Sequence, residues 1–215
     1  MHKPDTGNRE RKLIFLLTDR PKLLGDPEAR QARLSQLREP HIAALTAFVE
    51  ALRQEVGKDA HIPYFDPWDG GVEAQVLLLL EAPGPRAVKS GFVSRNNPDE
   101  TAKNFFEINV AAGLERKRTV VWNIVPWYIG TGTKIRAATS TDIKDGTPAL
   151  LSLLYLLPRL RKVVLIGRKA ERAQSAIASA RPDLQLLPCP HPSPLYVNHH
   201  SSHREKVRIA LAAAV

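Results

Sequence analysis

The stretch A-Q-V-L-L-L-L-E-A-P-G-P-R, residues 74–86, decides the fold. An unbroken apolar run that ends at proline and glycine is typical of a strand buried on both faces, as in a parallel sheet. Three further short apolar runs follow along the chain, at residues 119–125, 162–167 and 184–187. Helical segments separate the four runs. This alternation predicts an α/β fold in a single domain: a mostly parallel four-stranded sheet with helices on both faces.

Helix-start signals lie before and between these runs. Asp26-Pro27 pairs an N-cap residue with a proline at the first helical position, and residues 41–56 carry apolar side chains at helical spacing. We therefore expect an N-terminal helical segment over about residues 26–56, interrupted near Pro40. The later helices are expected over residues 97–112, 142–157 and 168–180, and another ends the chain. All of these elements are assigned to one domain over residues 1–215.

Composition restricts the class of protein. The chain is 43% hydrophobic and 25% charged, and no apolar run approaches the roughly 18 residues that a membrane helix needs. The apolar patch Leu13–Leu17 is too short for a secretory signal core, so we expect a cytoplasmic protein, nucleoid-associated if bacterial, with no membrane contact. The single cysteine, Cys189, excludes an internal disulfide and a four-cysteine metal site. We also expect a monomer.

The charge of the chain favours a polyanionic partner. Lys and Arg number 31 and Asp and Glu 22, which gives a formal net charge of +9. Such an excess attracts nucleic acid through long-range electrostatics, although many basic proteins bind none specifically.

Three of the loops that follow the strands have unusual sequences: E-A-P-G-P-R at 81–86, N-I-V-P-W-Y at 123–128 and P-C-P-H-P-S-P-L at 188–195. Ligands of open parallel sheets bind outside the carboxyl ends of the strands, where these loops lie. Proline fixes φ and stiffens the backbone, which suits a preorganised site. The alternative is that the prolines only end the strands.

These loops resemble those of the uracil-DNA glycosylase superfamily. E-A-P-G at 81–84 resembles the first motif of the branch that usually carries an iron–sulfur cluster, and H-P-S-P-L at 191–195 resembles the second motif of the superfamily. Gly91-Phe92-Val93 resembles the base-stacking segment, and Asn123 stands where the family keeps its base-reading asparagine. The chain lacks the four cysteines of the iron–sulfur branch, so no cofactor is expected. Packing is expected to take over the stabilising role of the cluster, with the N-terminal helices as the candidate elements.

The resemblance implies a monofunctional DNA glycosylase that flips uracil out of DNA and hydrolyses its N-glycosidic bond, leaving an abasic site. His191 would donate a hydrogen bond to uracil O2, and Asn123 would match O4 and N3–H of uracil. Glu81 would position or activate the attacking water. In isolation, His191 would more often be a surface or structural histidine, and Asn123 could equally be a strand-end cap.

Further residues take binding roles by the same resemblance. Phe92 would stack on the extruded base, rather than Phe105 or Phe106, whose positions in the predicted helix favour core packing. Gly84 stands where another branch has a tyrosine that blocks the thymine methyl, so bases besides uracil are also candidate substrates. Ser193 and the Gly84 amide would hold phosphate, and Leu195 would enter the duplex as a wedge, with Tyr196 as its rival.

Basic side chains near these loops would form a phosphate-tracking rim on single- or double-stranded DNA. They are Arg86, Lys89, Arg95, Lys134, Arg136, His199, His200 and His203. For each of them alone, a solvated surface charge is the rival interpretation. The three histidines lack accompanying carboxylate or cysteine ligands, so we expect no metal site.

Two other classes of function remain open. One is a catalytically inactive member of the superfamily that binds uracil-containing or damaged DNA. The other is an unrelated nucleotide-binding or phosphate-binding α/β protein, although E-A-P-G-P-R lacks the glycine spacing of either common phosphate-binding fingerprint.

Overall fold

The central sheet carries the candidate loops. The computed structural model describes residues 18–57, 60–132 and 134–215, so the Leu13–Leu17 patch lies outside the described residues. Four strands form one sheet in the order β4-β2-β7-β8, and every neighbouring pair is parallel. Their bounds are β2 Val76–Leu80, β4 Thr119–Asn123, β7 Lys162–Ile166 and β8 Gln185–Cys189. The predicted α/β fold with a parallel four-stranded sheet is confirmed.

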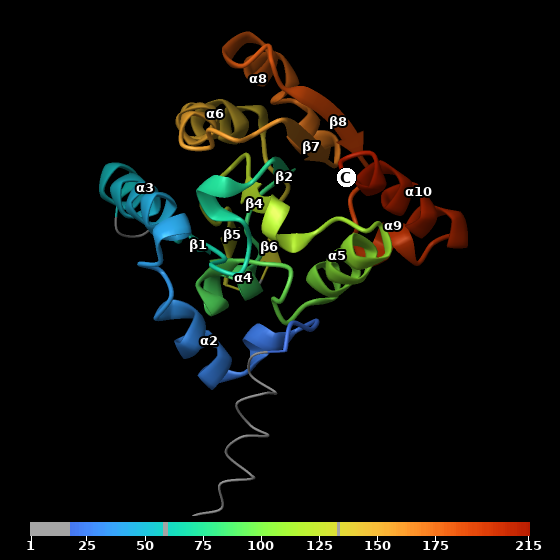
Figure 1. Cartoon of the computed structure of the whole chain (residues 1–215), viewed down its shortest axis with the longest axis horizontal. Coiled ribbons are helices and arrows are strands. Elements are labelled where there is room, and N and C mark those ends of the chain that lie inside the picture. The colour runs from blue at the N-terminus through green and yellow to red at the C-terminus, as the bar shows by residue number, and fades with distance from the viewer. Residues whose placement is uncertain (1–17, 58–59, 133) are drawn as a thin grey trace, which may run out of the picture.

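Helices cover the sheet on both sides (Figure 1). On one side α3 (Pro40–Val56) and α8 (Gln174–Ala180) contact α6 (Ser140–Tyr155). On the other side α5 (Glu100–Ala111) packs against α10 (Ser201–Ala212), which also contacts β8. This two-sided cover explains why the strands are apolar without alternation.

The helix starts follow from local chemistry. The Asp26 side chain accepts from two backbone amides at the start of α2 (Pro27–Leu34), and Pro40 is the first residue of α3. The Asp99 side chain caps α5, and Thr139 with Asp142 forms a capping box on α6. The helix predicted over 168–180 is two shorter helices, α7 (Arg168–Glu171) and α8.

Several short elements that the sequence did not predict complete the fold. β1 (Tyr64–Phe65) pairs in parallel with β3 (Phe92–Val93), and β5 (Gly130–Thr131) forms a hairpin with β6 (Lys134–Ile135). The remaining elements are η1 Leu23–Gly25, η2 Gly71–Glu73, α4 Pro85–Ser90, η3 Arg116–Arg118 and α9 Pro194–Val197. Several of them border the loops after the main strands.

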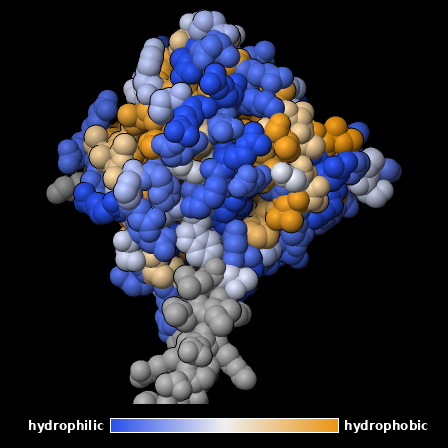
Figure 2. Space-filling model, in the orientation of Figure 1, coloured by the Kyte–Doolittle hydropathy of each residue, from blue (hydrophilic) through white to orange (hydrophobic). Residues whose placement is uncertain are grey.

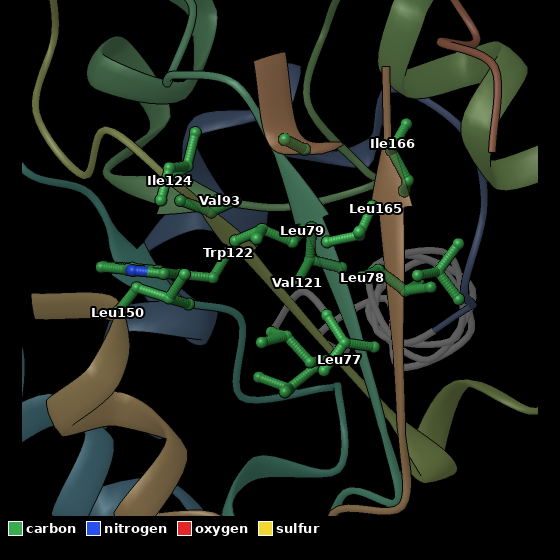
Figure 3. Close-up of a cluster of buried hydrophobic side chains, with 14 of the residues drawn as sticks. Leu77, Leu78, Leu79, Val93, Val121, Trp122, Ile124, Leu150, Leu165 and Ile166 are labelled. Atoms are coloured by element: carbon green, nitrogen blue, oxygen red, sulfur yellow. The ribbon is translucent and has the colours of Figure 1, made fainter. Parts of the chain in front are cut away.

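The core packs on both faces of β2. Leu77, Leu78 and Leu79 are each 0% exposed, although consecutive strand side chains point to opposite faces (Figure 3). Trp122 of β4 stacks on Phe65 with ring centroids 4.0 Å apart and an interplanar angle of 13°. Burial of each large apolar side chain stabilises the folded protein by about 1.5–3 kcal/mol. This packing fixes the strands whose ends carry the candidate loops.

The face of the molecule that Figure 2 shows is mostly polar. In Figure 2 hydrophilic residues cover most of the visible face, and apolar residues form scattered patches. Within the described ranges, no helix is both long enough and apolar enough to cross a membrane.

Candidate active site

Residues at or just after the carboxyl ends of β2, β4 and β8 meet at one cavity. Leu80 of β2 pairs with Asn123 of β4, and Ile166 of β7 pairs with Cys189 of β8. Glu81 is the first residue after β2 and therefore lies next to Asn123. His191 is the second residue after the end of β8. The cavity has a volume of about 450 Å³, and Glu81, Gly84, Arg86, Asn123 and His191 all line it. The structure thus brings together five of the residues singled out in the sequence.

Glu81 is held by hydrogen bonds on both its side chain and its backbone. Its Oε1 accepts from the backbone N–H of Ala138 at 2.6 Å, and its carbonyl accepts from Val125 N–H at 2.9 Å. The Ala138 carbonyl in turn accepts from Lys169 Nζ, so the segment leading into α6 is fixed from two sides. Ile135, Arg136 and Ala137 of this segment form one wall of the cavity. An ionised carboxylate has room for about four hydrogen bonds, so Glu81 retains acceptor capacity for a water.

Asn123 presents an amide without a protein partner. Its side chain is 3% exposed, and within the described part of the chain its Nδ2 has no hydrogen-bond partner. Leaving a buried donor unsatisfied costs about 1–3 kcal/mol, and such groups in native structures call for a specific explanation. A ligand carbonyl in the cavity would supply the missing acceptor.

His191 lies in surroundings that favour its neutral form. Burial lowers the pKa of His191, and the nearby Glu81 carboxylate opposes this shift without overcoming it. The imidazole is therefore neutral at pH 7 and carries one N–H donor. Gly167, at the end of β7, lies directly against it: a Cβ at Gly167 would stand 3.3 Å from the His191 Cβ.

Phe92 does not line the cavity, contrary to its predicted role. It is 0% exposed in β3, whereas its neighbour Val93 lines the cavity. Successive strand residues point to opposite faces, so the pairing of β3 with β1 that turns Val93 toward the cavity turns Phe92 away. The aromatic ring on the cavity wall belongs to Phe105 of α5, which helical spacing had assigned to the core. Phe105 is both a core residue, with an exposed fraction of 3%, and part of the cavity lining.

Two predicted DNA contacts lie outside the cavity lining. Ser193 is the N-cap residue of α9, and its carbonyl accepts from the amides of Tyr196 and Val197. Leu195, one residue into that helix, is 90% exposed. Tyr196 instead stacks on His203 with ring centroids 4.3 Å apart, which leaves Leu195 as the projecting side chain. No group of three or more His, Cys, Asp or Glu residues in the described ranges is arranged to hold a metal ion.

A buried ionic cluster adjoins the cavity, and sequence reasoning missed it. Asp66 accepts from Arg33 and, at 2.7 Å, from Arg116, and Ser94 Oγ also donates to it. Burial alone would raise the pKa of Asp66, but the charges of Arg116 and Arg33 outweigh it and hold that pKa well below its usual range. Ser94 lines the cavity, so the cluster joins α2 to the cavity wall. The sequence signal was the acidic pair in D-P-W-D at 66–69.

A second carboxylate completes this cluster. Asp69 Oδ1 accepts from Arg116 at 2.9 Å and lies 3.6 Å from Arg95. Burial raises the pKa of Asp69, against the opposing charges of Arg95 and Arg116. The cluster thus fixes Arg95 in the interior, since its side chain is 3% exposed, and Arg95 is not part of a surface rim.

Comparison with known proteins agrees with the fold. The cavity lies at the carboxyl edge of the sheet, which is the edge where α/β proteins with parallel strands bind their ligands. More narrowly, the chain belongs to the uracil DNA glycosylase superfamily, whose family model matches residues 67–214. That match covers the main sheet and all four strand-end loops.

Two solved structures illustrate the likeness. SMUG2 of Pedobacter heparinus is 13% identical, with a TM-score of 0.52 over 83% of this chain and 84% of that chain. UNG of Nitratifractor salsuginis is 12% identical, with a TM-score of 0.43 over 99% of this chain and 98% of that chain. No curated protein matches the chain.

Proposed function

We propose that this protein is a monofunctional DNA glycosylase that removes uracil from DNA. The observation that carries the proposal is the unpaired Nδ2 of Asn123, buried beside Glu81 and His191 in a cavity large enough for an extruded base. Family membership supports the glycosylase class. The positive net charge supports DNA as the partner.

Each side chain has a role in this reaction. Asn123 Nδ2 donates to uracil O4, and its carbonyl accepts from N3–H, whereas cytosine presents the reversed pattern. The Phe105 ring on the cavity wall supplies the apolar surface for the extruded base. Gly84 and Arg86 lie at the cavity edge, and Leu195 and Ser193 lie on the adjacent loop, where they would contact the DNA backbone and the vacated stack.

Cleavage of the N-glycosidic bond requires groups that stabilise the charge developing on the base and on the sugar. As the bond between C1′ of the sugar and N1 of uracil breaks, its electron pair goes to the base, and the neutral His191 donates to O2 to stabilise that anion. A water bound to Glu81 adds its oxygen to C1′ and gives up a proton to the carboxylate. The products are an abasic sugar and the uracil anion, which becomes free uracil by taking up a proton from water as it leaves, while the Glu81 carboxyl returns its proton to water. No lysine is assigned as a nucleophile, so the DNA strand stays intact.

The test is release of uracil from a labelled oligonucleotide with one uracil, by wild type and by the His191→Ala and Glu81→Ala variants. Wild type should release uracil and leave an alkali-labile strand, and each variant should lose activity by about 10²-fold or more. Tight binding of the uracil strand with no base released from any substrate would instead indicate an inactive DNA-binding member of the superfamily.

Gly84 should set the breadth of substrates. A Cβ at Gly84 would meet no atom within 4 Å, and its φ of −78° suits any residue. We therefore expect wild type to accept bases bulkier than uracil and Gly84→Tyr to fold normally but to discriminate against them. A panel of oligonucleotides with 5-substituted uracils measures the ratio of kcat/KM values. Equal ratios for the two proteins would refute this role for Gly84.

Gly167 should be required for the position of His191. Its φ of +83° and ψ of 157° lie in a region essentially restricted to glycine, where a side chain costs about 1–3 kcal/mol, and the added methyl of Gly167→Ala would crowd the His191 Cβ at 3.3 Å. Displacement of a catalytic group by about 1 Å can lower a reaction rate by 10²-fold. The excision rate of Gly167→Ala should therefore fall by much more than its loss of folded protein explains. Gly57→Ala is the matched control, because Gly57 has a φ of +109° and a ψ of 156°, close to those of Gly167, and no neighbour within 4 Å. Equal losses of excision in the two variants would contradict this role.

A further inference from the structure

A second cavity lies next to the candidate active site. The two share Ile135 and Arg136 in their linings, and the second has a volume of about 760 Å³. It is formed by the β5–β6 hairpin and the segment before it. We call it the hairpin groove and define it by Trp127, Tyr128, Lys134, Ile135 and Arg136. None of the predicted base-contacting residues lines it.

The aromatic part of the groove is preorganised. Tyr128 Oη donates to the Gly132 carbonyl at 3.0 Å, and Tyr128 N–H donates to the His61 carbonyl at 3.1 Å. A Cβ at Gly130 would lie only 2.5 Å from Tyr128 Cζ, so the ring rests against the bare backbone of the hairpin. The ring is fixed before any ligand arrives, which lowers the entropic cost of stacking on it.

Apolar surface separates the two cavities. Ile135 is 44% exposed although it is a β-branched apolar residue that lines both cavities. Trp127 packs partly against the core and presents the rest of its surface to the groove. An apolar divider flanked by aromatic rings suits two flat, adjacent ring systems, one in each cavity.

The charge of the groove is positive. Lys134 is exposed, and Arg136 donates to Asp142 at 2.6 and 2.8 Å through its two terminal nitrogens. The Asp142 carboxylate offsets Arg136, so Lys134 supplies the excess charge. This arrangement matches a single phosphodiester beside a stacked base.

We propose that the hairpin groove binds the nucleotide next to the extruded base on the same DNA strand. Its base stacks on Tyr128 and Trp127, and its phosphate lies at Lys134. The inference rests on the proposed function, because it assigns DNA to the neighbouring cavity. The groove adds a contact to the DNA strand that carries the extruded base, and this contact does not require a complementary strand.

Binding of a short single-stranded oligonucleotide without uracil tests the proposal independently of catalysis. Tyr128→Ala should weaken binding about tenfold or more, as removal of a base-stacking aromatic does, and Tyr128→Phe should retain it. Lys134→Gln should weaken binding and lower the salt dependence by about 0.7 in log–log slope. Lys144→Gln is the matched control, since Lys144 is exposed on α6 outside the groove. Thermal melting of Tyr128→Ala checks that the variant is folded.

Tryptophan fluorescence supplies a local readout. The oligonucleotide should quench wild-type fluorescence, and the quenching should disappear in Trp127→Phe, because the base stacks on that indole. Trp122 is 0% exposed and cannot report contact, and the third tryptophan, Trp68, lines a separate pocket that shares no residue with the groove.

Two results would overturn the proposal: unchanged binding by both Tyr128→Ala and Lys134→Gln, or an equal loss in Lys134→Gln and Lys144→Gln. The second result would show general charge attraction. Wild-type protein that binds through the groove but releases no base would overturn the proposed function alone. Protein that releases uracil, with groove variants that bind as wild type does, would overturn the groove alone.

Discussion

Replacing Asn123 by aspartate should reduce uracil excision by a factor on the order of 10²–10³, as loss of one preorganised donor does. Asn123 Nδ2 is the donor that has no protein partner, and aspartate would place an acceptor opposite uracil O4. Single-turnover excision measures the effect on the chemical step. Retention of wild-type rates would show that Asn123 does not read the base.

The same substitution should make stability depend on pH. Asn123 is 3% exposed, so the new carboxyl would be buried without a cation assigned to it, and its folded-state pKa would rise. An acid with a raised folded-state pKa destabilises the protein above that pKa, and the loss is relieved as pH falls through it. Asn123→Leu, of similar volume and without charge, should be inactive at every pH and lack this dependence. Urea unfolding across pH separates the two variants.

Replacing Asp66 by asparagine should destabilise the protein by about 3–5 kcal/mol, because it leaves buried Arg33 and Arg116 short of their counter-charge. The free energy of unfolding from urea titration measures the loss. Because the pKa of Asp66 is depressed in the folded protein, its contribution is present above its unfolded pKa and is lost only as pH falls toward the folded value.

Two controls distinguish this buried cluster from surface ion pairs. Asp183→Asn removes an exposed partner of Arg181 and should leave the unfolding free energy near that of wild type. The double variant Arg33→Met with Asp66→Leu should recover part of the loss, since it removes the uncompensated charge of Arg33. A small effect of Asp66→Asn alone would mean that water or Asp69 compensates the arginines. Ser94 donates to Asp66 and lines the cavity. The excision rate per folded molecule of Asp66→Asn would therefore show whether this part of the cavity wall is kept.

The fold was predictable because its signals are local and redundant. The run at 74–80 contains β2, and the start of β4 at Thr119 and of β7 at Lys162 coincides with the apolar runs. β8 extends two residues beyond its predicted end, through Pro188 to Cys189, because an edge strand tolerates proline. The short pairs β1–β3 and β5–β6 depend on tertiary contacts, and two-residue strands leave no periodic signal.

The candidate site was predictable in part. Glu81, Asn123 and His191 converge because parallel strands bring their carboxyl ends to one edge, and that convergence follows from the strand order. The orientation of Phe92 did not follow, since it depends on which face of β3 meets β1. Phe105 and the Asp66 cluster depend on where α5 and α2 lie in the folded chain, which spacing along the sequence does not specify.

Cys189 gives the second-motif loop a reporter of its own motion. Burial raises the pKa of this thiol to about 12, its exposed fraction is 1%, and it stands two residues before His191. The sulfur is therefore neither ionised nor accessible, and alkylation requires the end of β8 to open locally. The rate of thiol labelling thus measures local opening at the strand end that carries the His191 loop, and a ligand that stabilises this strand end would slow that rate without touching the sulfur.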